Sequence, residues 1–289
     1  VIPAGQSVLL DVSPPKLHVL IIQGSLVFDR ADLNLDAHYI FVQGGSLTVG
    51  TESEPFLNKA VITLHGTPTS PELPIYGAKV LGCRGCTLDL HGAPTLRSWT
   101  TLNASAPANT SELWLREPVD WAVDSYVVVT STSWVKEEAE KVLVTAVDSD
   151  GYRLQLAQPL DFDHLGETRF FDGRPVELRA EVGLLTRNVK VQGSEADSDE
   201  PAMYGAHIMM HSKGHESLVG RIENIEMTRV GQAFRLGRYP LHFHMIGNVR
   251  ESYLRHVSLH RTYNRAVTLH GVHYLRVHHN VAYDVMGHA

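Results

Sequence analysis

Short apolar segments separated by glycine and proline fill the first 92 residues of the chain. Segments such as LHVLIIQGSLVF, YIFVQGGSLTVG, AVITLHG and CTLDLHG carry Val, Ile, Leu or Thr in alternation or in short blocks, which is typical of β-strands. Glycines stand between them where turns need a positive φ, and Pro14, Pro15 and Pro55 end strands. The intervals are far too short for crossover helices. The pattern therefore predicts stacked β-coils or a β-sandwich and argues against a βαβ sheet.

Strand-like patterning resumes over residues 113–182, in segments such as SYVVVTST, KVLVTAV and PVELRAEV. Within it, the charge mix of residues 134–141 (WVKEEAEK) predicts one or two exposed helical turns. The preceding residues 98–111 are small and polar and contain N-glycosylation sequons at Asn103 and Asn109. Two sequons in one loop favour an extracellular protein, and an unmodified Ser/Thr loop is the alternative.

A pattern repeats in the last third of the chain. Asn224-Ile225-x-Met227, His256-Val257-x-Leu259 and Asn280-Val281-x-Tyr283 each contain a polar residue, a β-branched residue, a spacer and a large apolar residue. The intervals of 32 and 24 residues are typical of solenoids, in which each coil buries its face on the next. We attribute the longer interval to an excursion over residues 237–247. The repeat predicts a parallel β-helix, with an unrelated β-sandwich as the alternative.

Composition excludes several classes of protein. The 289 residues are 43% hydrophobic and 20% charged, as in an ordinary folded domain. The formal net charge of −7 gives no excess of basic residues that would favour binding to nucleic acid. No apolar run approaches the roughly 20 residues that span a bilayer, so we expect no membrane-embedded segment. The chain starts at Val1 with no leader, and we expect it to be a fragment of a larger protein.

Histidine is concentrated at the C-terminal end, where 12 of the 17 histidines occur from His207 onward. Residues one coil apart in a parallel β-helix stack at about 4.8 Å. The 24-residue interval places His260 over Asp284, with Thr228 one coil earlier in the same column. Such a column can be a structural ladder, a carbohydrate or metal site, or simply solvent-exposed.

His242 and His244 alternate on one face of a strand, which is compatible with chelation but common by chance. The histidines lack the tight spacing of zinc motifs, so the sequence assigns neither a metal nor another cofactor. Cysteine occurs only at Cys83 and Cys86, outside any thioredoxin-like βαβ context, so redox catalysis is not expected. In an oxidising compartment this pair predicts a disulfide across a turn, and two free buried thiols are the alternative.

Specific motifs at both ends of the chain point to a known family. The N-terminal motifs are VIPAGQSVLLDVSPPKLHVLIIQGSLVF, GGSLTVGTESEPF and AVITLHG. The C-terminal motifs are LRAEVGLLTRNVKVQG, GRYPLHFHMIGNV, LHRTYNRAVTLHGVHYL and NVAYDVMGHA, in which RAEVGLLTRN and RYPLHFH are highly specific. Together they resemble the family that combines a G8 domain with parallel β-helix repeats. This family includes fibrocystin, fibrocystin-L and related cell-surface or secreted hyaluronan-degrading proteins.

The resemblance implies an all-β protein, with a G8 β module at residues 1–182 and the first coils of a right-handed parallel β-helix at residues 183–289. The family pattern continues past this point, so we expect a truncated solenoid. Hyaluronan-degrading members carry a large extra domain after the HG…SWT segment. Here His91-Gly92 and Ser98-Trp99-Thr100 run straight into the sequon loop, which favours the fibrocystin group.

The fibrocystin group implies a non-catalytic extracellular module of a large receptor-like protein of cilia or stereocilia, whose parent crosses the membrane once. Such a module is a rigid stalk or a surface that binds an extracellular protein or glycan. The alternative is an enzyme that depolymerises hyaluronan or a related glycan, with His242, His244, Arg265 and Asp284 as candidate catalytic residues. Hydrolysis usually needs two carboxylates, and only one is well placed here. A third hypothesis is lectin-like binding of a glycan without turnover.

Overall fold

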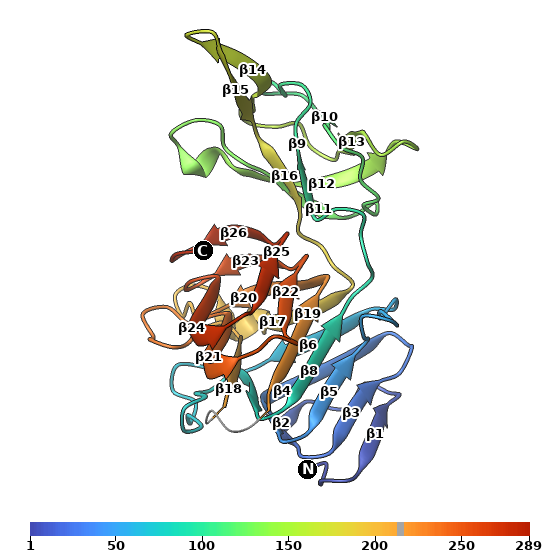
Figure 1. The fold of residues 1–289 in the computed structure, drawn as a ribbon, viewed down its shortest axis with the longest axis vertical. Coiled ribbons are helices and arrows are strands. Elements are labelled where there is room, and N and C mark those ends of the chain that lie inside the picture. The colour runs from blue at the N-terminus through green and yellow to red at the C-terminus, as the bar shows by residue number, and fades with distance from the viewer. Residues whose placement is uncertain (213–216) are drawn as a thin grey trace. The chain divides into compact units, whose positions relative to one another are not determined.

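Almost every regular element of the protein is a β-strand (Figure 1). The computed structural model describes residues 1–212 and 217–289. They form two compact units, one made of Val1–Pro94 with Arg187–Ala289 and the other of Thr95–Thr186. Within the described ranges, no helix has the length and apolar character needed to cross a membrane. The all-β class predicted from the apolar alternation is confirmed.

The first unit winds as a parallel β-helix whose coils have three sides (Figure 1). Side A consists of β6 (Ala60–Leu64), β17 (Val189–Gly193), β20 (Ile225–Val230), β23 (Ser258–Thr262) and β26 (Val281–Val285). Side B consists of β2 (Leu17–Ile22), β7 (Val80–Arg84), β18 (His207–His211), β21 (Leu241–Asn248) and β24 (Val267–His273). Side C consists of β1 (Ser7–Leu10), β3 (Ser25–Phe28), β5 (Ser46–Val49), β8 (Thr87–His91), β19 (Val219–Glu223), β22 (Tyr253–Arg255) and β25 (Arg276–His278). The long strand β4 (Leu33–Gln43) joins sides A and B, because its first half pairs with β6 and its second half with β2 and β7.

The hydrophobic core lies inside the coils, where inward side chains stack in columns. One column on side A passes through five paired strands, and its members are at most 1% exposed: Leu35, Ile62, Val191, Met227 and Leu259. The residues between them point outward, so the period-two pattern of the sequence becomes an apolar column inside and a polar ladder outside. Each coil therefore covers the apolar face of its neighbour.

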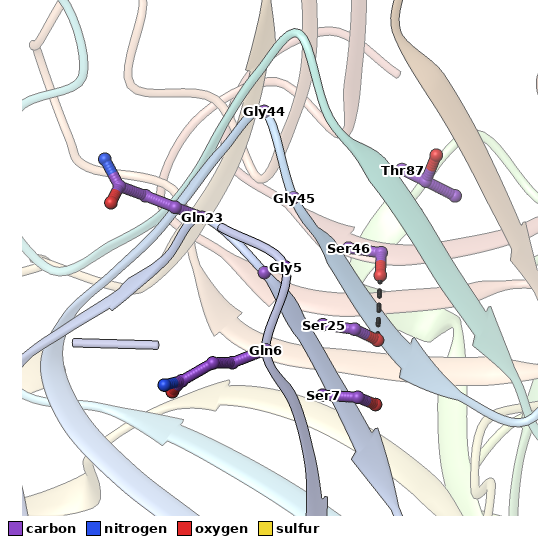
Figure 2. Close-up of a pocket in the computed structure, with 10 residues that line it drawn as sticks. Gly5, Gln6, Ser7, Gln23, Ser25, Gly44, Gly45, Ser46 and Thr87 are labelled. Carbon is purple, nitrogen blue, oxygen red and sulfur yellow. Dashed lines mark hydrogen bonds between the residues drawn. The ribbon is translucent and has the colours of Figure 1, made fainter. Parts of the chain in front are cut away.

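Glycine allows the first coils to approach closely at their turns. A Cβ atom at Gly24 would lie 2.2 Å from the carbonyl oxygen of Gln6, and one at Gly45 would lie 2.2 Å from the carbonyl oxygen of Gly24. Just after these turns, the Ser46 hydroxyl donates to Ser25 Oγ at 3.1 Å (Figure 2). The stacked turns border a groove of about 420 Å³, and none of its lining residues carries an ionisable side chain.

The second unit is an antiparallel sheet in the order β10-β13-β12-β11-β16-β9, with a separate β14–β15 hairpin. Its strands are β9 (Trp99–Thr101), β10 (Glu112–Trp114), β11 (Tyr126–Val129), β12 (Glu140–Val147), β13 (Arg153–Leu156), β14 (Gly166–Phe171), β15 (Arg174–Arg179) and β16 (Glu181–Leu184). A single 3₁₀ turn, η1 (Lys136–Glu138), lies where helical turns are predicted. The unit has its own core, which includes Leu113, Trp121, Val127 and Val144.

Asn188 holds the two segments that connect the β-helix to the second unit. Its Oδ1 accepts a hydrogen bond from the backbone N–H of Ala93 at 2.8 Å. Its Nδ2 donates to the carbonyl oxygens of Phe56 at 2.7 Å and Asn58 at 2.6 Å. Because Ala93 precedes the second unit and Asn188 follows it, one side chain fixes both connections on the same coil.

The expected division into residues 1–182 and 183–289 is wrong. Strand β8 pairs in parallel with β19, and β6 pairs in parallel with β17, so residues 1–94 supply the first coils of the same β-helix. Residues 95–186 are an inserted unit, where the sequence suggested a direct continuation. Strands of a coil and strands of an antiparallel sheet share the same alternation, so the alternation alone does not mark the boundary.

The expected column of Thr228, His260 and Asp284 is correct only for its first two residues. Thr228 lies opposite His260, with Thr228 Oγ1 3.4 Å from His260 Nδ1. The next register partner of His260 is Tyr283 rather than Asp284. Asp284 has a φ of 52° and lies one position further along, beside Arg261, whose φ is 53°.

The register differs because Asn280 is a turn residue. Its Oδ1 accepts from the backbone N–H of Val257 at 2.9 Å, and its Nδ2 donates to the carbonyl oxygen of Leu254 at 3.1 Å. The repeat pattern aligned Asn280 with His256, whereas strand pairing places it one position later. A slip of one residue exchanges the inward and outward faces of a strand, which moves Asp284 out of the His260 column.

Replacing Thr95–Thr186 by a short Gly-Ser linker is expected to leave the β-helix folded, because Asn188 and the paired strands hold both connections.

Deleting residues 1–94 is expected to make the protein insoluble, because it uncovers the apolar columns of β17, β18 and β19. Circular dichroism, gel filtration and thermal unfolding compare both variants with the parent protein. A monomeric, cooperatively unfolding product of the second deletion would contradict the shared β-helix.

Candidate functional site

The loops between sides A and B gather along one corner of the β-helix, which we call the A/B corner. They comprise residues 65–79, 194–206, 231–240 and 263–266, and the short helix α1 (Glu195–Ser198) lies in the second. The excursion expected at residues 237–247 is therefore misplaced. The extra residues are mainly 231–240, and Leu241–Asn248 is strand β21, which pairs with β18 and β24.

A buried lysine ties the first two of these loops together. Lys79 has no exposed surface, and its ammonium group forms an ion pair with Asp197. It also donates to Ser198 Oγ at 2.8 Å and to the carbonyl oxygen of Tyr204 at 2.9 Å. Desolvation lowers the pKa of Lys79, although the hydrogen bond and charge of Asp197 oppose that effect. The network makes the base of the A/B corner rigid.

The loop of residues 231–240 is fixed by polar contacts on both sides. Arg235 donates to Glu72 Oε1 at 2.7 Å and to the carbonyl oxygen of Pro68 at 3.0 Å. On the other side, Asn264 Nδ2 donates to the carbonyl oxygens of Gln232 at 2.8 Å and Arg235 at 3.1 Å. The loop is thus held in one conformation by neighbouring coils.

The same loop presents apolar side chains to solvent. Phe234 is 88% exposed and Leu236 is 89% exposed. They border a pocket of about 360 Å³, whose other lining residues are Arg235, Tyr239, Tyr263, Asn264, Arg265, Met286 and Gly287. The Arg265 guanidinium lies 5.3 Å from the centre of the Tyr239 ring, within the range of a cation–π contact.

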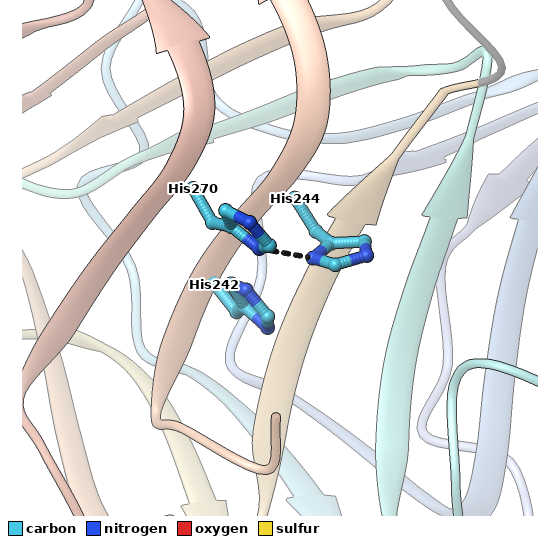
Figure 3. Close-up of side chains that lie close together, drawn as sticks. All are labelled: His242, His244 and His270. Carbon is cyan, nitrogen blue, oxygen red and sulfur yellow. Dashed lines mark hydrogen bonds between the residues drawn. The ribbon is translucent and has the colours of Figure 1, made fainter. Parts of the chain in front are cut away.

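Three imidazoles meet beside this pocket, on strands β21 and β24 (Figure 3). His242 is 2% exposed, and its Nδ1–H donates to the carbonyl oxygen of Gly237 at 3.0 Å. His242 Nε2 is buried and has no hydrogen-bond partner in the described part of the chain. The Nδ1 atoms of His244 and His270 lie 3.2 Å apart, and one nitrogen from each of the three rings lies within 4.8 Å of the others. We call His242, His244 and His270 the imidazole triad.

The surroundings favour the neutral forms of His242 and His244. Burial, together with the neighbouring imidazoles, lowers the pKa of His242 to about 4. Burial is also the largest cause of the lowered pKa of His244, followed by the charges of His270 and His211. A neutral imidazole offers a lone pair on one nitrogen. Because the Nδ1 of His242 donates to a carbonyl, its lone pair is on the unpartnered Nε2.

The structure brings together three of the four candidate catalytic residues. His242 and His244 share strand β21, and their ring centres are 4.8 Å apart. Arg265 is connected to them through Tyr239, whose ring centre is 5.0 Å from that of His242. Asp284 lies on a different side of the coil, on β26, so it does not join the imidazoles.

Sequence reasoning missed several residues of this region. His270 lies opposite His244 in register, 26 residues later, and this interval differs from the 24-residue repeat used for stacking. Phe234 and Leu236 also lie outside the repeat pattern, because the loop that carries them is an addition to the coil. The signal that identifies the loop is its high content of large apolar and arginine side chains between two strands.

A separate buried cluster surrounds His260 on side A. His260 Nε2 lies 3.0 Å from Glu226 Oε1, which also pairs with Lys190 at 3.0 Å. Thr228 completes the arrangement, so a hydroxyl, an imidazole and a carboxylate follow one another. The side chains of Thr228, His260 and Glu226 are buried, which removes them from substrate. This cluster fits the structural ladder considered in the sequence analysis.

A second group of imidazoles lies at the corner between sides C and A. His256, His278 and His279 also place one nitrogen each within 4.8 Å of the others. The His278 and His279 Nδ1 atoms are 2.7 Å apart, and the His279 ring stacks on that of His256 at 5.1 Å. Burial lowers the pKa of His256 to about 4.

The remaining candidate positions lie apart from these clusters. Cys83 and Cys86 form a disulfide, with their Cα atoms 5.7 Å apart. Asn103 and Asn109, the asparagines of the sequons, lie in the second unit with exposed side chains. Exposure makes both available for glycosylation.

Comparison with known proteins identifies relatives of the whole chain. The G8 domain family model matches residues 1–103, and the CEMIP beta-helix model matches residues 203–289. Fibrocystin-L from Homo sapiens and from Mus musculus are each 42% identical over 99% of this chain. Fibrocystin from Mus musculus is 30% identical over all of it. The chain spans only 8% of the length of each of these relatives.

Among solved structures, the tailspike gp61 of Pseudomonas phage phi297 aligns with 86% of this chain and 40% of its own. The identity is 13% and the TM-score is 0.27. A likeness at this level carries no argument about function.

The buried His207 on β18 predicts a loss of stability in mild acid. Its Nε2 donates to the carbonyl oxygen of Tyr76 at 2.8 Å, and burial lowers its pKa to about 3. The unfolded chain protonates the same ring near pH ~6.5. Below that pH the unfolded state binds a proton that the folded state excludes, so stability falls by up to about 1.4 kcal/mol per pH unit.

We therefore expect His207→Gln to lose less stability than the parent protein between about pH 7 and about pH 5. Urea unfolding at a series of pH values measures this slope, which is independent of any constant destabilisation of the variant. The control is His273→Gln, which changes an exposed ring. Equal slopes for the parent protein and His207→Gln would show that His207 does not control acid stability.

Proposed function

Because the chain belongs to the family that joins a G8 domain to β-helix repeats, as in fibrocystin-L, we propose that it is a rigid, non-catalytic module that binds an extracellular ligand. The parent protein is proposed to be a single-pass cell-surface protein of cilia or stereocilia, with this part outside the cell. The disulfide and two exposed sequons support an extracellular setting. The continuous apolar columns support a stiff scaffold.

The observation that carries the binding role is the display of Phe234 and Leu236 on a fixed loop. Large apolar side chains in contact with water cost free energy, so a grouped pair on a rigid element is typical of an interaction surface. Since Arg235 and Asn264 already hold the loop, binding does not have to order it. Pre-ordering of this kind improves affinity because less conformational entropy is lost on binding.

The chemistry of the pocket favours a protein segment with apolar and acidic side chains. Phe234, Leu236 and Met286 offer apolar contacts, and Arg265 supplies a cation. No carboxylate of the described residues forms an ion pair with Arg265, whereas Arg235 is paired with Glu72. An incoming carboxylate can therefore pair with Arg265 without displacing an internal partner.

The same geometry supports binding better than glycan turnover. A depolymerising site needs an accessible base and a cationic partner at the substrate. The unpartnered nitrogen of His242 is buried, and Asp284 lies on another side of the coil. The proposed function therefore includes no catalytic step.

Replacing both Phe234 and Leu236 by serine is expected to reduce binding of the labelled, tetramerised protein to ciliated epithelial cells, with little change in thermal stability. Leu57→Ser is the matched control, because Leu57 is also a large exposed side chain, at 72%. Flow cytometry measures binding before and after the cells are treated with protease or hyaluronidase. We expect protease treatment to abolish binding and hyaluronidase treatment to leave it unchanged.

Equal binding by the double variant and the parent protein would contradict the role of the loop. Loss of binding after hyaluronidase but not after protease would assign a glycan ligand instead. The same protein, incubated with hyaluronan and chondroitin at acidic and neutral pH, is expected to leave their chain lengths unchanged. Shortened chains would overturn the non-catalytic proposal.

Secretion from mammalian cells is expected to add N-glycans to Asn103 and Asn109. Peptide-N-glycosidase treatment should then lower the mass of the parent protein by two glycans, and of Asn103→Gln or Asn109→Gln by one. Mass spectrometry of the intact protein distinguishes these cases. A parent protein whose mass does not change on treatment would remove this support for an extracellular setting.

A further inference from the structure

The imidazole triad of His242, His244 and His270 has the features of a metal-ligand set rather than of a simple ladder. A ladder explains the column in which His211, His244 and His270 occupy paired register positions on β18, β21 and β24. It does not explain His242, which lies two residues away on β21 and pairs in register with Met209 and Thr268. His242 nevertheless turns its ring to within 4.8 Å of the His244 ring centre.

His242 contributes a buried nitrogen that has no partner among residues 1–212 and 217–289. Its Nε2 is buried without a hydrogen bond, although a buried polar atom normally has one. Its Nδ1–H is held by the carbonyl oxygen of Gly237 at 3.0 Å, which fixes the tautomer and the ring orientation. A backbone carbonyl that accepts a hydrogen bond from the far nitrogen of a histidine is the usual support of a metal ligand.

The distances between the rings suit a small tetrahedral ion. Two nitrogens that bind one zinc ion at about 2.0–2.1 Å in tetrahedral geometry lie about 3.3 Å apart. The Nδ1 atoms of His244 and His270 are 3.2 Å apart, and the triad nitrogens all lie within 4.8 Å (Figure 3). The third nitrogen lies within 4.8 Å of these two, so its ring has to rotate to reach the same ion.

The donor atoms and the charged neighbours of the triad suit a metal ion. The Nδ1–H of His242 donates to a carbonyl oxygen, so the lone pair of this ring lies on Nε2, which has no partner among the described residues. The nearby cation Arg238 is paired with Glu72 at 3.1 Å, which reduces its repulsion of an incoming ion. Imidazole ligands favour zinc and later transition metals over calcium and magnesium, which prefer oxygen.

We propose that His242, His244 and His270 bind a zinc ion that links consecutive coils of the β-helix and keeps a fourth coordination position for water or a ligand. Two ligands come from β21 and one from β24, so the ion connects two stacked strands. Three histidines with an open fourth position are a known arrangement for zinc. The site lies next to the Arg265 pocket through Tyr239.

The test uses the full chain in a background that carries His278→Ala and His279→Ala, which removes the second imidazole group. Zinc affinity is measured by competition with a chromophoric chelator, and coordination by the visible absorption of the Co²⁺-loaded protein. The background protein is expected to bind one zinc ion per chain. His270→Ala should weaken binding by at least about tenfold, since the loss of a group that only hydrogen-bonds to a metal ligand already costs about 10–100-fold.

Folding is controlled separately, because His270 is exposed and its loss leaves the core unchanged. His273→Ala, on the same strand, is the matched control and should bind zinc as the background does. Zinc should raise the unfolding temperature of the background and of His273→Ala, but not of His270→Ala or His244→Ala. A background protein that binds no zinc, or equal zinc affinity in His270→Ala, would overturn the proposal.

Discussion

The stacking of one coil on the next is the constraint on which the rest of the structure depends. Inward columns such as Ile62, Val191 and Met227 are almost completely buried only because neighbouring coils cover them. No single coil encloses a core by itself, so the sequence must place an apolar residue at the same inward position in successive coils. Residues that face outward, and the loops between sides, are free of this requirement. Function can therefore vary there without cost to the core.

The A/B corner illustrates this freedom. The loops at this corner differ in length from coil to coil, yet the strands on either side remain paired. Long loops also need their own stabilisation, and Lys79, Arg235 and Asn264 supply it through buried or bridging hydrogen bonds. The result is a set of side chains from distant parts of the sequence on one rigid surface, with the imidazole triad and the Phe234 loop as neighbours.

Much of the fold could be predicted from the sequence, because apolar alternation and repeat spacing depend on inward columns. The pairing of Thr228 with His260 follows from the 32-residue interval. The next pairing could not be derived in the same way, since Asn280 bonds to the backbone of the preceding coil and shifts the register by one residue. The inserted unit was missed because apolar and polar residues alternate in its strands in the same way as in the strands of the coils.

The candidate site was only partly accessible to the same reasoning. His242 and His244 are recognisable as a pair on one strand face, and Arg265 follows a strand end. The contribution of His270 depends on the register of β21 with β24, which pairs it with His244 at an interval of 26 residues instead of the 24-residue repeat. The exposure of Phe234 depends on how neighbouring loops pack. Neither an interval that departs from the repeat nor loop packing leaves a periodic trace in the sequence.

The clamp made by Asn188 has a consequence for how such a protein can change over evolutionary time. Both connections to the inserted unit are hydrogen-bonded to one coil, so the packing of the coils does not depend on the segment between the connections. The entropic cost of closing a loop rises only with the logarithm of its length, by about 0.6 kcal/mol for each doubling. Insertions of very different size can therefore replace one another at this position without disturbing the β-helix.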